Sequence, residues 1–105
     1  MAFQLGSALL EACVLAVVIN EDAYGYKLTQ EVKQIMDVSE STLYPVLRRL
    51  QKDGYLETYD QPYQGRNRRY YRITPAGRCQ FESFLKQWNG FRDKIDNLMN
   101  GGIAQ

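Results

Sequence analysis

The chain of 105 residues has no histidine and only two cysteines, Cys13 and Cys79. Two cysteines without a histidine are too few for a zinc site, and they provide no disulfide framework. We therefore expect no metal and no cofactor. Both cysteines are predicted to pack as small core residues.

Other elements of catalytic sites are missing as well. The sequence has neither paired carboxylates at a plausible site nor a glycine-rich phosphate loop. Because histidine is also absent, no catalytic constellation can be assembled from the motifs. We therefore expect that the protein is not an enzyme.

Long apolar runs are also absent. The longest, residues 12–19, is too short to span a membrane. It has no charged segment before it and no convincing cleavage site after it, so it does not resemble a secretory signal. We therefore expect a cytoplasmic protein without a membrane partner.

The overall charge is nearly balanced, at +1, but its distribution is uneven. Between Tyr44 and Arg78 the chain has eight basic and three acidic residues, a net charge of +5, whereas the remainder carries −4. A local basic region on a nearly neutral chain is typical of a protein that turns one surface toward phosphate.

The most informative segment is SESTLYPVLRRLQKDG, residues 39–54. Its apolar residues recur at the spacing of one helical face, which is predicted to enter a core: Leu43, Val46, Leu47 and Leu50. Ser39 and Ser41 are both suitable N-caps, and Gly54 suits the left-handed end of the helix. The segment is therefore predicted to be an amphipathic helix.

The opposite side of this helix is polar, aromatic and cationic, with Ser41, Tyr44, Arg48 and Lys52 in one stripe. Such side chains can reach base edges and phosphates, as a recognition helix does in a major groove. Taken alone, the stripe is better interpreted as a solvated helix face. Its interpretation depends on the neighbouring segments.

Two helices are expected before this segment. The first, residues 5–20, is apolar on almost every side and is predicted to be buried all round. Asp22 is the expected cap of the second, residues 24–36, whose apolar face holds Leu28, Val32, Ile35 and Met36. Gly25 near its start suggests a close backbone approach. Two short helices across a tight turn indicate a helix-turn-helix.

The segment after Gly54 changes to a strand pattern. Residues 55–59 and 69–74 are rich in aromatic and β-branched residues, and Pro62 and Gly65 are turn residues in the stretch between them. This pattern predicts a β-hairpin with a basic tip: Arg66, Asn67, Arg68 and Arg69. Such a tip can lie along a minor groove or the phosphate backbone, although basic tips also occur as solvated edges.

The last helix is expected over residues 75–100, with Thr74 as its cap and Pro75 at its first position. Large apolar residues follow a heptad spacing along it: Phe81, Phe84, Trp88, Phe91, Ile95 and Leu98. A helix of this length overhangs the preceding domain. The simplest partner for its seam is a second copy of the chain, so a homodimer is expected.

Together these elements predict a mainly α fold with a β-hairpin, in the α+β class. Residues 1–74 would form a winged helix-turn-helix DNA-binding domain, and residues 75–105 a C-terminal dimerisation helix with a short tail. The basic hairpin directly behind the helix-turn-helix favours the DNA-binding interpretation of the helical stripe.

Three motifs, YGYKLTQEV, SESTLYPVLRRLQKDGYL and GRNRRYYRITPAG, closely resemble the PadR family of bacterial transcription regulators. The resemblance covers most of residues 5–80 and is specific in combination. It implies a compact subfamily of homodimers with a single C-terminal helix, several of which repress drug-efflux or stress genes. The partner implied is double-stranded promoter DNA.

The resemblance and the charge pattern together predict the DNA-contacting residues. Ser41, Thr42 and Tyr44 are the candidates for sequence readout, and Arg48, Arg49 and Lys52 for phosphate contacts. The remaining candidates lie at the cap of the recognition helix, at the start of the second helix and on the wing: Ser39, Tyr24, Tyr26, Lys27, Arg66, Asn67 and Arg68.

Some compact members of the family bind planar hydrophobic compounds between tryptophans at the dimer interface, and Trp88 stands at the matching place. On this resemblance the predicted effector site is lined by Trp88, Phe84, Phe91, Asp96, Leu9 and Cys13. From its spacing alone, Trp88 is better explained as packing in the dimer seam. The two interpretations are compatible, since a flat aromatic pair can also stack a ligand.

The leading hypothesis is therefore a homodimeric repressor with a role in multidrug sensing, released from DNA by a small hydrophobic or aromatic effector. The alternative is a ligand-binding or protein-interaction module that uses the winged helix as a platform without reading DNA. The concentration of basic residues on the helix and wing favours DNA.

Overall fold

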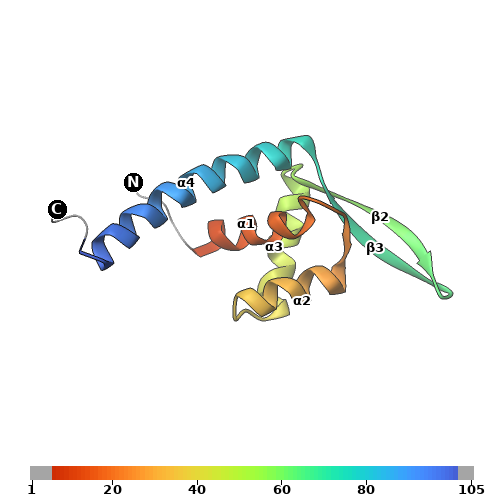
Figure 1. The fold of residues 1–105 in the computed structure, drawn as a ribbon. Coiled ribbons are helices and arrows are strands. Elements are labelled where there is room, and N and C mark those ends of the chain that lie inside the picture. Colours follow the sequence, from red (N-terminus) through yellow and green to blue (C-terminus); the bar gives the residue numbers. More distant parts are fainter. Residues whose placement is uncertain (1–5, 102–105) are drawn as a thin grey trace.

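The computed structural model describes residues 6–101, which form four helices and a three-stranded antiparallel sheet. The α+β class and the long last helix are thereby confirmed. Figure 1 shows the first three helices packed together, with the hairpin extending to one side and the last helix running past them to the other. The elements are α1 (Gly6–Val18), β1 (Ala23–Tyr24), α2 (Gly25–Ile35), α3 (Glu40–Lys52), β2 (Leu56–Tyr63), β3 (Arg66–Ile73) and α4 (Pro75–Met99).

The core lies where α1, α2 and α3 meet the base of the hairpin. The expected face of α3 is confirmed, because all four of its apolar residues are buried: Leu43, Val46, Leu47 and Leu50. Leucines and valines from the other elements complete the core, including Val14, Leu15, Leu28, Val32 and Leu56. Burying such side chains supplies the main driving force for folding.

The first helix differs from the prediction in its burial. It ends at Val18, and the expected start at Leu5 lies outside the described residues. It is not buried all round, because Ala16 is exposed and Leu9 and Cys13 are only partly buried. This side of α1 faces α4, which does not fully cover it.

The second helix begins without the predicted cap. Tyr24 occupies the N-cap position and makes no capping hydrogen bond, whereas the Asp22 carboxylate accepts a hydrogen bond of 2.5 Å from the Tyr59 hydroxyl. Tyr24 and Ala23 instead form β1, a short strand that the sequence did not predict. The expectation for Ile35 was also wrong: it is 79% exposed, near the end of the helix.

The hairpin is longer and its turn tighter than predicted. Residues 56–63 pair in register with residues 66–73, which leaves only Gln64 and Gly65 in the turn. Both have positive φ, 50° and 78°, as a type I′ turn requires. Pro62 therefore lies in a strand and not in the turn. The position is tolerated because β2 is an edge strand.

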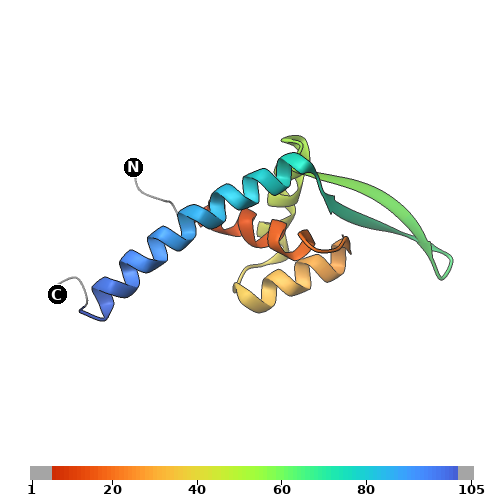
Figure 2. The ribbon, with the colours of Figure 1, turned by 45° about the horizontal axis from the view of Figure 1, so that its top comes forward.

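The last helix begins as predicted, with the Thr74 hydroxyl accepting a hydrogen bond of 2.9 Å from the Gly77 amide. Figures 1 and 2 show its N-terminal part over α1 and its C-terminal part extending beyond the rest of the fold. Cys79 on this helix is exposed, so the prediction that it packs in the core was wrong, whereas Cys13 is partly buried and packs against the core. Both thiols are free.

The close backbone approach occurs at Gly77 and not at Gly25. A Cβ atom on Gly25 would lie 3.5 Å from the Tyr71 ring, an ordinary contact. A Cβ atom on Gly77 would lie 2.2 Å from the Tyr55 carbonyl oxygen and 2.8 Å from the Ile73 side chain. The root of α4 can therefore pack against residues 54–55 and the end of β3 only because this residue has no side chain.

Replacing Gly77 with alanine should lower the free energy of unfolding by about 1–3 kcal/mol, because the methyl group overlaps backbone that cannot easily move. Urea unfolding at a fixed protein concentration measures the change. Gly90→Ala on the same helix is the matched control, since no neighbour lies within 4 Å of its added Cβ atom. That change should raise stability by about 0.5–1 kcal/mol. Equal stability of the two variants would contradict this account of Gly77.

Candidate nucleic-acid interface

The outward side of α3 is exposed along its length. Ser41, Thr42, Arg48 and Lys52 are all exposed, and Tyr44 is 41% exposed. These residues lie opposite the four buried apolar residues of the same helix, so core packing fixes which side chains point outward. The predicted sequence-reading residues therefore share one accessible surface.

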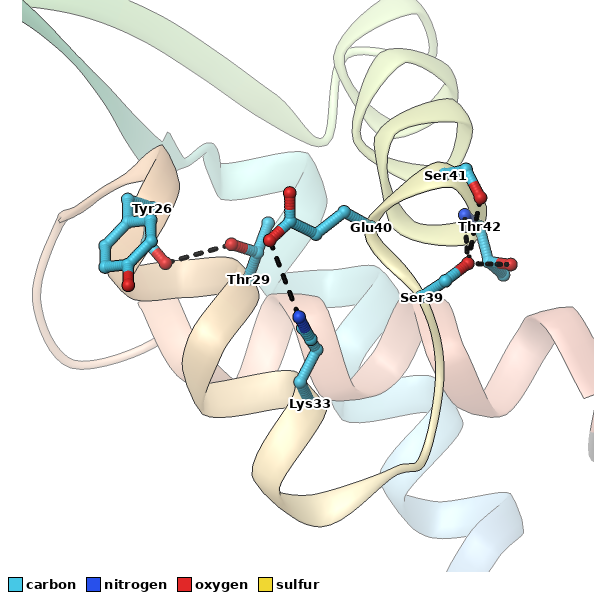
Figure 3. A network of polar contacts seen from close by, with 7 residues as sticks. All are labelled: Tyr26, Thr29, Lys33, Ser39, Glu40, Ser41 and Thr42. Carbon is cyan, nitrogen blue, oxygen red and sulfur yellow. Dashed lines mark hydrogen bonds and ion pairs between the residues drawn. The ribbon is translucent and has the colours of Figure 1, made fainter.

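The start of α3 is held by a cluster of hydroxyl groups, shown in Figure 3. Ser39 is the N-cap, and its hydroxyl accepts a hydrogen bond of 3.3 Å from the Thr42 amide. The Ser39 hydroxyl also lies 2.9 Å from that of Ser41 and 3.1 Å from that of Thr42. Of the two predicted caps, Ser39 is the one used. Its hydroxyl orients those of two predicted base-reading residues.

Two polar contacts support the helix-turn-helix in the same region, one between α2 and α3 and one within α2. The Lys33 ammonium lies 3.5 Å from the Glu40 carboxylate, across the turn between the helices. On α2, the buried Thr29 hydroxyl donates a hydrogen bond of 2.9 Å to the Tyr26 carbonyl. Lys33 and Glu40 thus join the two helices at their surface, whereas the Thr29 hydroxyl satisfies its hydrogen bond inside α2.

Several basic residues of the +5 segment are engaged within the fold. Arg49 donates two hydrogen bonds, of 2.7 and 2.9 Å, to one carboxylate oxygen of Glu11 on α1. Three other arginines are also engaged: Arg69 with Asp60, Arg72 with Glu57, and Arg78 with the Ile19 carbonyl. Within residues 6–101, no ion pair involves the basic residues Arg48, Lys52, Arg66 and Arg68.

The wing and the start of α2 form one concave surface, which encloses a volume of about 500 Å³. It brings together five of the predicted DNA-binding residues with two that the sequence did not indicate: Tyr24, Tyr26, Arg66, Asn67, Arg68, Tyr63 and Gln64. Tyr26 is 63% exposed there. Lys27 is also exposed, with its ammonium 3.9 Å from the Glu31 carboxylate.

Tyr63 could have been found from the turn. A two-residue turn at Gln64 and Gly65 places Tyr63 opposite Arg66 and next to Arg68 on one face of the hairpin. The proline at position 62 favoured a longer turn and concealed this register. The recoverable signal was the pair Gln64-Gly65 between a tyrosine-rich segment, residues 55–63, and a segment rich in arginine and tyrosine, residues 66–73.

Contacts of the sheet with α3 place this helix beside the base of the wing. The Gln51 amide donates a hydrogen bond of 3.4 Å to the Thr58 hydroxyl on β2. Burial raises the pKa of the Tyr71 phenol on β3, and the nearby cation of Arg69 opposes this shift. Tyr44 and Arg48 are also close enough to influence this phenol. The exposed stripe of α3 therefore adjoins the sheet from which the wing extends.

The predicted effector residues line two hollows that meet at Trp88. The first, of about 200 Å³ between α1 and α4, includes Leu9, Cys13 and Phe84. The second, of about 450 Å³ farther along α4, includes Phe91 and Asp96, with Arg92, Ile95 and Met99. The first is almost entirely apolar, and burial raises the pKa of the Cys13 thiol.

The predicted dimer seam follows one side of α4. Five of its six residues are partly buried within the single chain, and Leu98 near the end is 63% exposed. Phe81 packs against the main core. The C-terminal half of the seam extends with the helix beyond the rest of the fold (Figure 2).

Comparison with known protein families matches residues 14–83 to the Transcriptional regulator PadR-like family. The chain belongs to this family. Its membership makes it a transcriptional regulator and not an enzyme, and it supports a DNA-binding role for the helix-turn-helix. The family resemblance seen in the sequence is thereby confirmed.

Similar proteins are known from several bacteria. This PadR-like chain is 33% identical over 97 residues to an uncharacterised protein of Lysinibacillus sphaericus, covering 88% of this chain and 89% of that one. It is 46% identical over 61 residues to the transcriptional regulator Rv3488 of Mycobacterium tuberculosis, covering 57% of each chain.

Solved structures show the same architecture. A PadR-like transcriptional regulator from Bacillus cereus has 33% identity and a TM-score of 0.82, over 92% of this chain and 97% of that one. The protein smu.1704 from Streptococcus mutans has 40% identity and a TM-score of 0.86, over 96% and 95% of the two chains. The winged-helix fold of this PadR-like protein is therefore established from its relatives as well as from its own packing.

Two features are absent from the described residues, 6–101. No helix there is long and apolar enough to cross a bilayer. Nor do His, Cys, Asp and Glu side chains gather there in a group of three that could hold a metal ion.

Proposed function

We propose that this PadR-like chain is a homodimeric repressor that binds promoter DNA through α3 and the wing and is released by a small planar hydrophobic effector. The observation that carries the proposal is the outward stripe of α3, with Ser41, Tyr44 and Arg48 exposed beside a basic hairpin. A helix that presents short polar, aromatic and cationic side chains suits a major groove.

The DNA contacts divide by chemistry. Ser41, Thr42 and Tyr44 read base edges, because their side chains are short or aromatic and lie in the N-terminal half of α3. Arg48 and Lys52 contact phosphates farther along the helix, being exposed and outside the ion pairs of the described residues. Arg49 is left out of this set because its guanidinium is bound to Glu11.

The concave surface between α2 and the wing extends the footprint along the DNA backbone. Its tyrosine hydroxyls and exposed Arg66 can donate hydrogen bonds to phosphate oxygens, and Asn67 lies at the tip where the hairpin meets a minor groove. Lys27 adds a cation next to Tyr26. Such contacts hold the protein in position and give the affinity its dependence on salt.

Dimerisation through α4 gives the DNA-binding protein two-fold symmetry. The exposed apolar side chains Leu98 and Met99, 63% and 79% exposed, lie at the end of α4 that extends beyond the rest of the fold. A second copy packed along the seam covers these residues and presents a second α3. Two recognition helices then read half-sites about one helical turn apart, roughly 10 base pairs.

An effector acts from the hollows that meet at Trp88. Their lining is largely apolar and includes the only tryptophan of the chain, which suits a flat hydrophobic compound. Relief of repression requires that this compound bind the DNA-competent and DNA-incompetent dimers with different affinity. The spacing of the two α3 helices is the property that distinguishes those two states.

Specific binding is tested with the protein's own promoter fragment and a scrambled fragment of equal composition, titrated across a series of salt concentrations. We expect at least a thousandfold preference for the promoter. Arg48→Gln should reduce the salt slope by about 1.8, the value for the two phosphate contacts that a dimer loses. Tyr44→Ala should change which base is preferred within a half-site.

Arg49→Gln is the matched control for Arg48→Gln, since it removes the same charge from the next residue. It should leave the salt slope unchanged and lower stability by at most about 1 kcal/mol, because its ion pair is partly solvated. Equal affinity for promoter and scrambled DNA would refute specific regulation. It would favour the alternative, a ligand-binding or protein-interaction module that does not recognise a DNA sequence.

The dimer is tested by placing a charge in the seam. Ile95→Glu buries a carboxylate between two copies and should yield monomers, whereas wild type should sediment at twice the chain mass of 12.2 kDa. Lys94→Glu is the control, because Lys94 is an exposed residue off the seam and its variant should remain dimeric. A dimeric Ile95→Glu protein would place the interface elsewhere.

The effector site is tested through the emission of Trp88. Planar hydrophobic cations and phenolic compounds should quench it, and the compounds that quench should also weaken binding to the promoter. Trp88→Leu should keep its promoter affinity in the presence of those compounds. If no compound changes the emission and none changes DNA binding, this part of the proposal fails.

A further inference from the structure

The outer half of the wing is a two-stranded ribbon. The third strand, β1, pairs with β3 only at Tyr70 and Tyr71, whereas β2 and β3 continue together to the turn at Gln64 and Gly65. An isolated two-stranded ribbon is at best marginally stable in water, and its strands twist readily. The position of the wing tip therefore depends on contacts beyond the strand pairing.

Arg68 makes such a contact. Its guanidinium carbon lies 4.0 Å from the centroid of the Tyr24 ring and 3.5 Å from that of the Tyr63 ring. Arg68 is partly buried, although residues 60–67 and Arg69 are exposed. A planar guanidinium at these distances from two rings makes a cation–π contact with each.

The two rings belong to different parts of the fold. Tyr63 is the last residue of β2, next to the turn, whereas Tyr24 is the N-cap residue of α2. Tyr24 also packs against Tyr70, with ring centroids 5.9 Å apart, and Tyr70 stacks on Tyr59 at 5.5 Å. Arg68 therefore joins the wing tip to a row of aromatic rings that is anchored at the start of α2.

We propose that Arg68 is a positioning residue, which fixes the wing tip against α2 through contacts that we name the Tyr24–Arg68–Tyr63 clamp. This inference rests on the proposed function and refines the role predicted for Arg68, which was that of a DNA contact on the wing. The wing tip and the start of α2 line the same concave surface, so the clamp holds the two sides of that surface at a fixed separation.

The clamp strengthens DNA binding without supplying charge to it. A wing that is already ordered pays less conformational entropy when it meets DNA. Lysine cannot replace arginine in this role, because its ammonium is a compact and strongly hydrated charge that does not stack between two rings. Retaining the charge while losing the planar group therefore separates positioning from phosphate contact.

The experiment compares Arg68→Lys with wild type, first without DNA and then with the promoter fragment. Without DNA, hydrogen exchange of the paired amides in residues 61–68 should accelerate by roughly two- to tenfold. This factor corresponds to the free energy of one or two cation–π contacts at an exposed site. Exchange in α4 should be unchanged. Promoter affinity should fall by a similar factor. The dependence of that affinity on salt concentration should have the same slope as in wild type, because the charge is retained.

Arg69→Lys is the matched control, since it makes the same chemical change one residue away, on the opposite face of the ribbon. Its exchange rates should equal those of wild type, because lysine can keep the ion pair with Asp60. Tyr63→Leu removes one ring and no charge, and should reproduce the effects of Arg68→Lys.

The clamp is refuted if Arg68→Lys leaves the exchange of residues 61–68 unchanged, or if exchange accelerates and promoter affinity does not fall. A phosphate contact alone would leave both Arg68→Lys and Tyr63→Leu close to wild type. If the wild-type protein does not prefer its promoter, the proposed function fails, whereas the exchange measurement still decides whether the clamp holds the wing.

Discussion

The burial of one side of α3 is the constraint on which the rest of the interface depends. Leu43, Leu47 and Leu50 are almost completely enclosed by α1, α2 and the base of the hairpin. Rotating the helix about its axis would expose these leucines and bury charged side chains, both at large cost in free energy. The outward direction of Tyr44 and Arg48 follows from this packing and from the register of the sequence. The exposed side of α3 is thus set by the packing of its buried side.

The parts of the fold that could be predicted are those encoded by local patterns. Helix periodicity gave the buried side of α3, and a threonine before a proline gave the start of α4, because capping involves only neighbouring residues. The turn of the hairpin was misjudged, since Pro62 favoured a loop where the edge of a sheet accepts it. Ile35 fits a helical apolar face by spacing, yet α2 ends there and its side chain is exposed. These errors concern the surroundings of a residue, which local patterns do not describe.

Local sequence patterns also fail to predict which charged residues of the candidate site are paired within the fold. The count of basic residues correctly indicated a basic segment, but not which of its cations are engaged within the fold. Arg49 and Glu11 are separated by 38 residues and meet only because α1 packs against α3. Hydrogen bonding between Tyr59 and Asp22 likewise spans 37 residues, and it raises the pKa of the Tyr59 phenol. Adjacent arginines such as Arg48 and Arg49 consequently have different surroundings, which only the tertiary structure distinguishes.

The junction between α3 and α4 has a mechanical consequence. The Thr74 hydroxyl donates a hydrogen bond of 2.6 Å to the Gly54 carbonyl, directly after α3, and Gly77 lies against the Tyr55 carbonyl. This tight joint leaves little freedom for α4 to pivot against α3. In a dimer built on α4, a change in the crossing angle of the two long helices would act as a lever that swings each attached α3. A change of a few degrees in the crossing angle would then change the distance between the two α3 helices by ångströms.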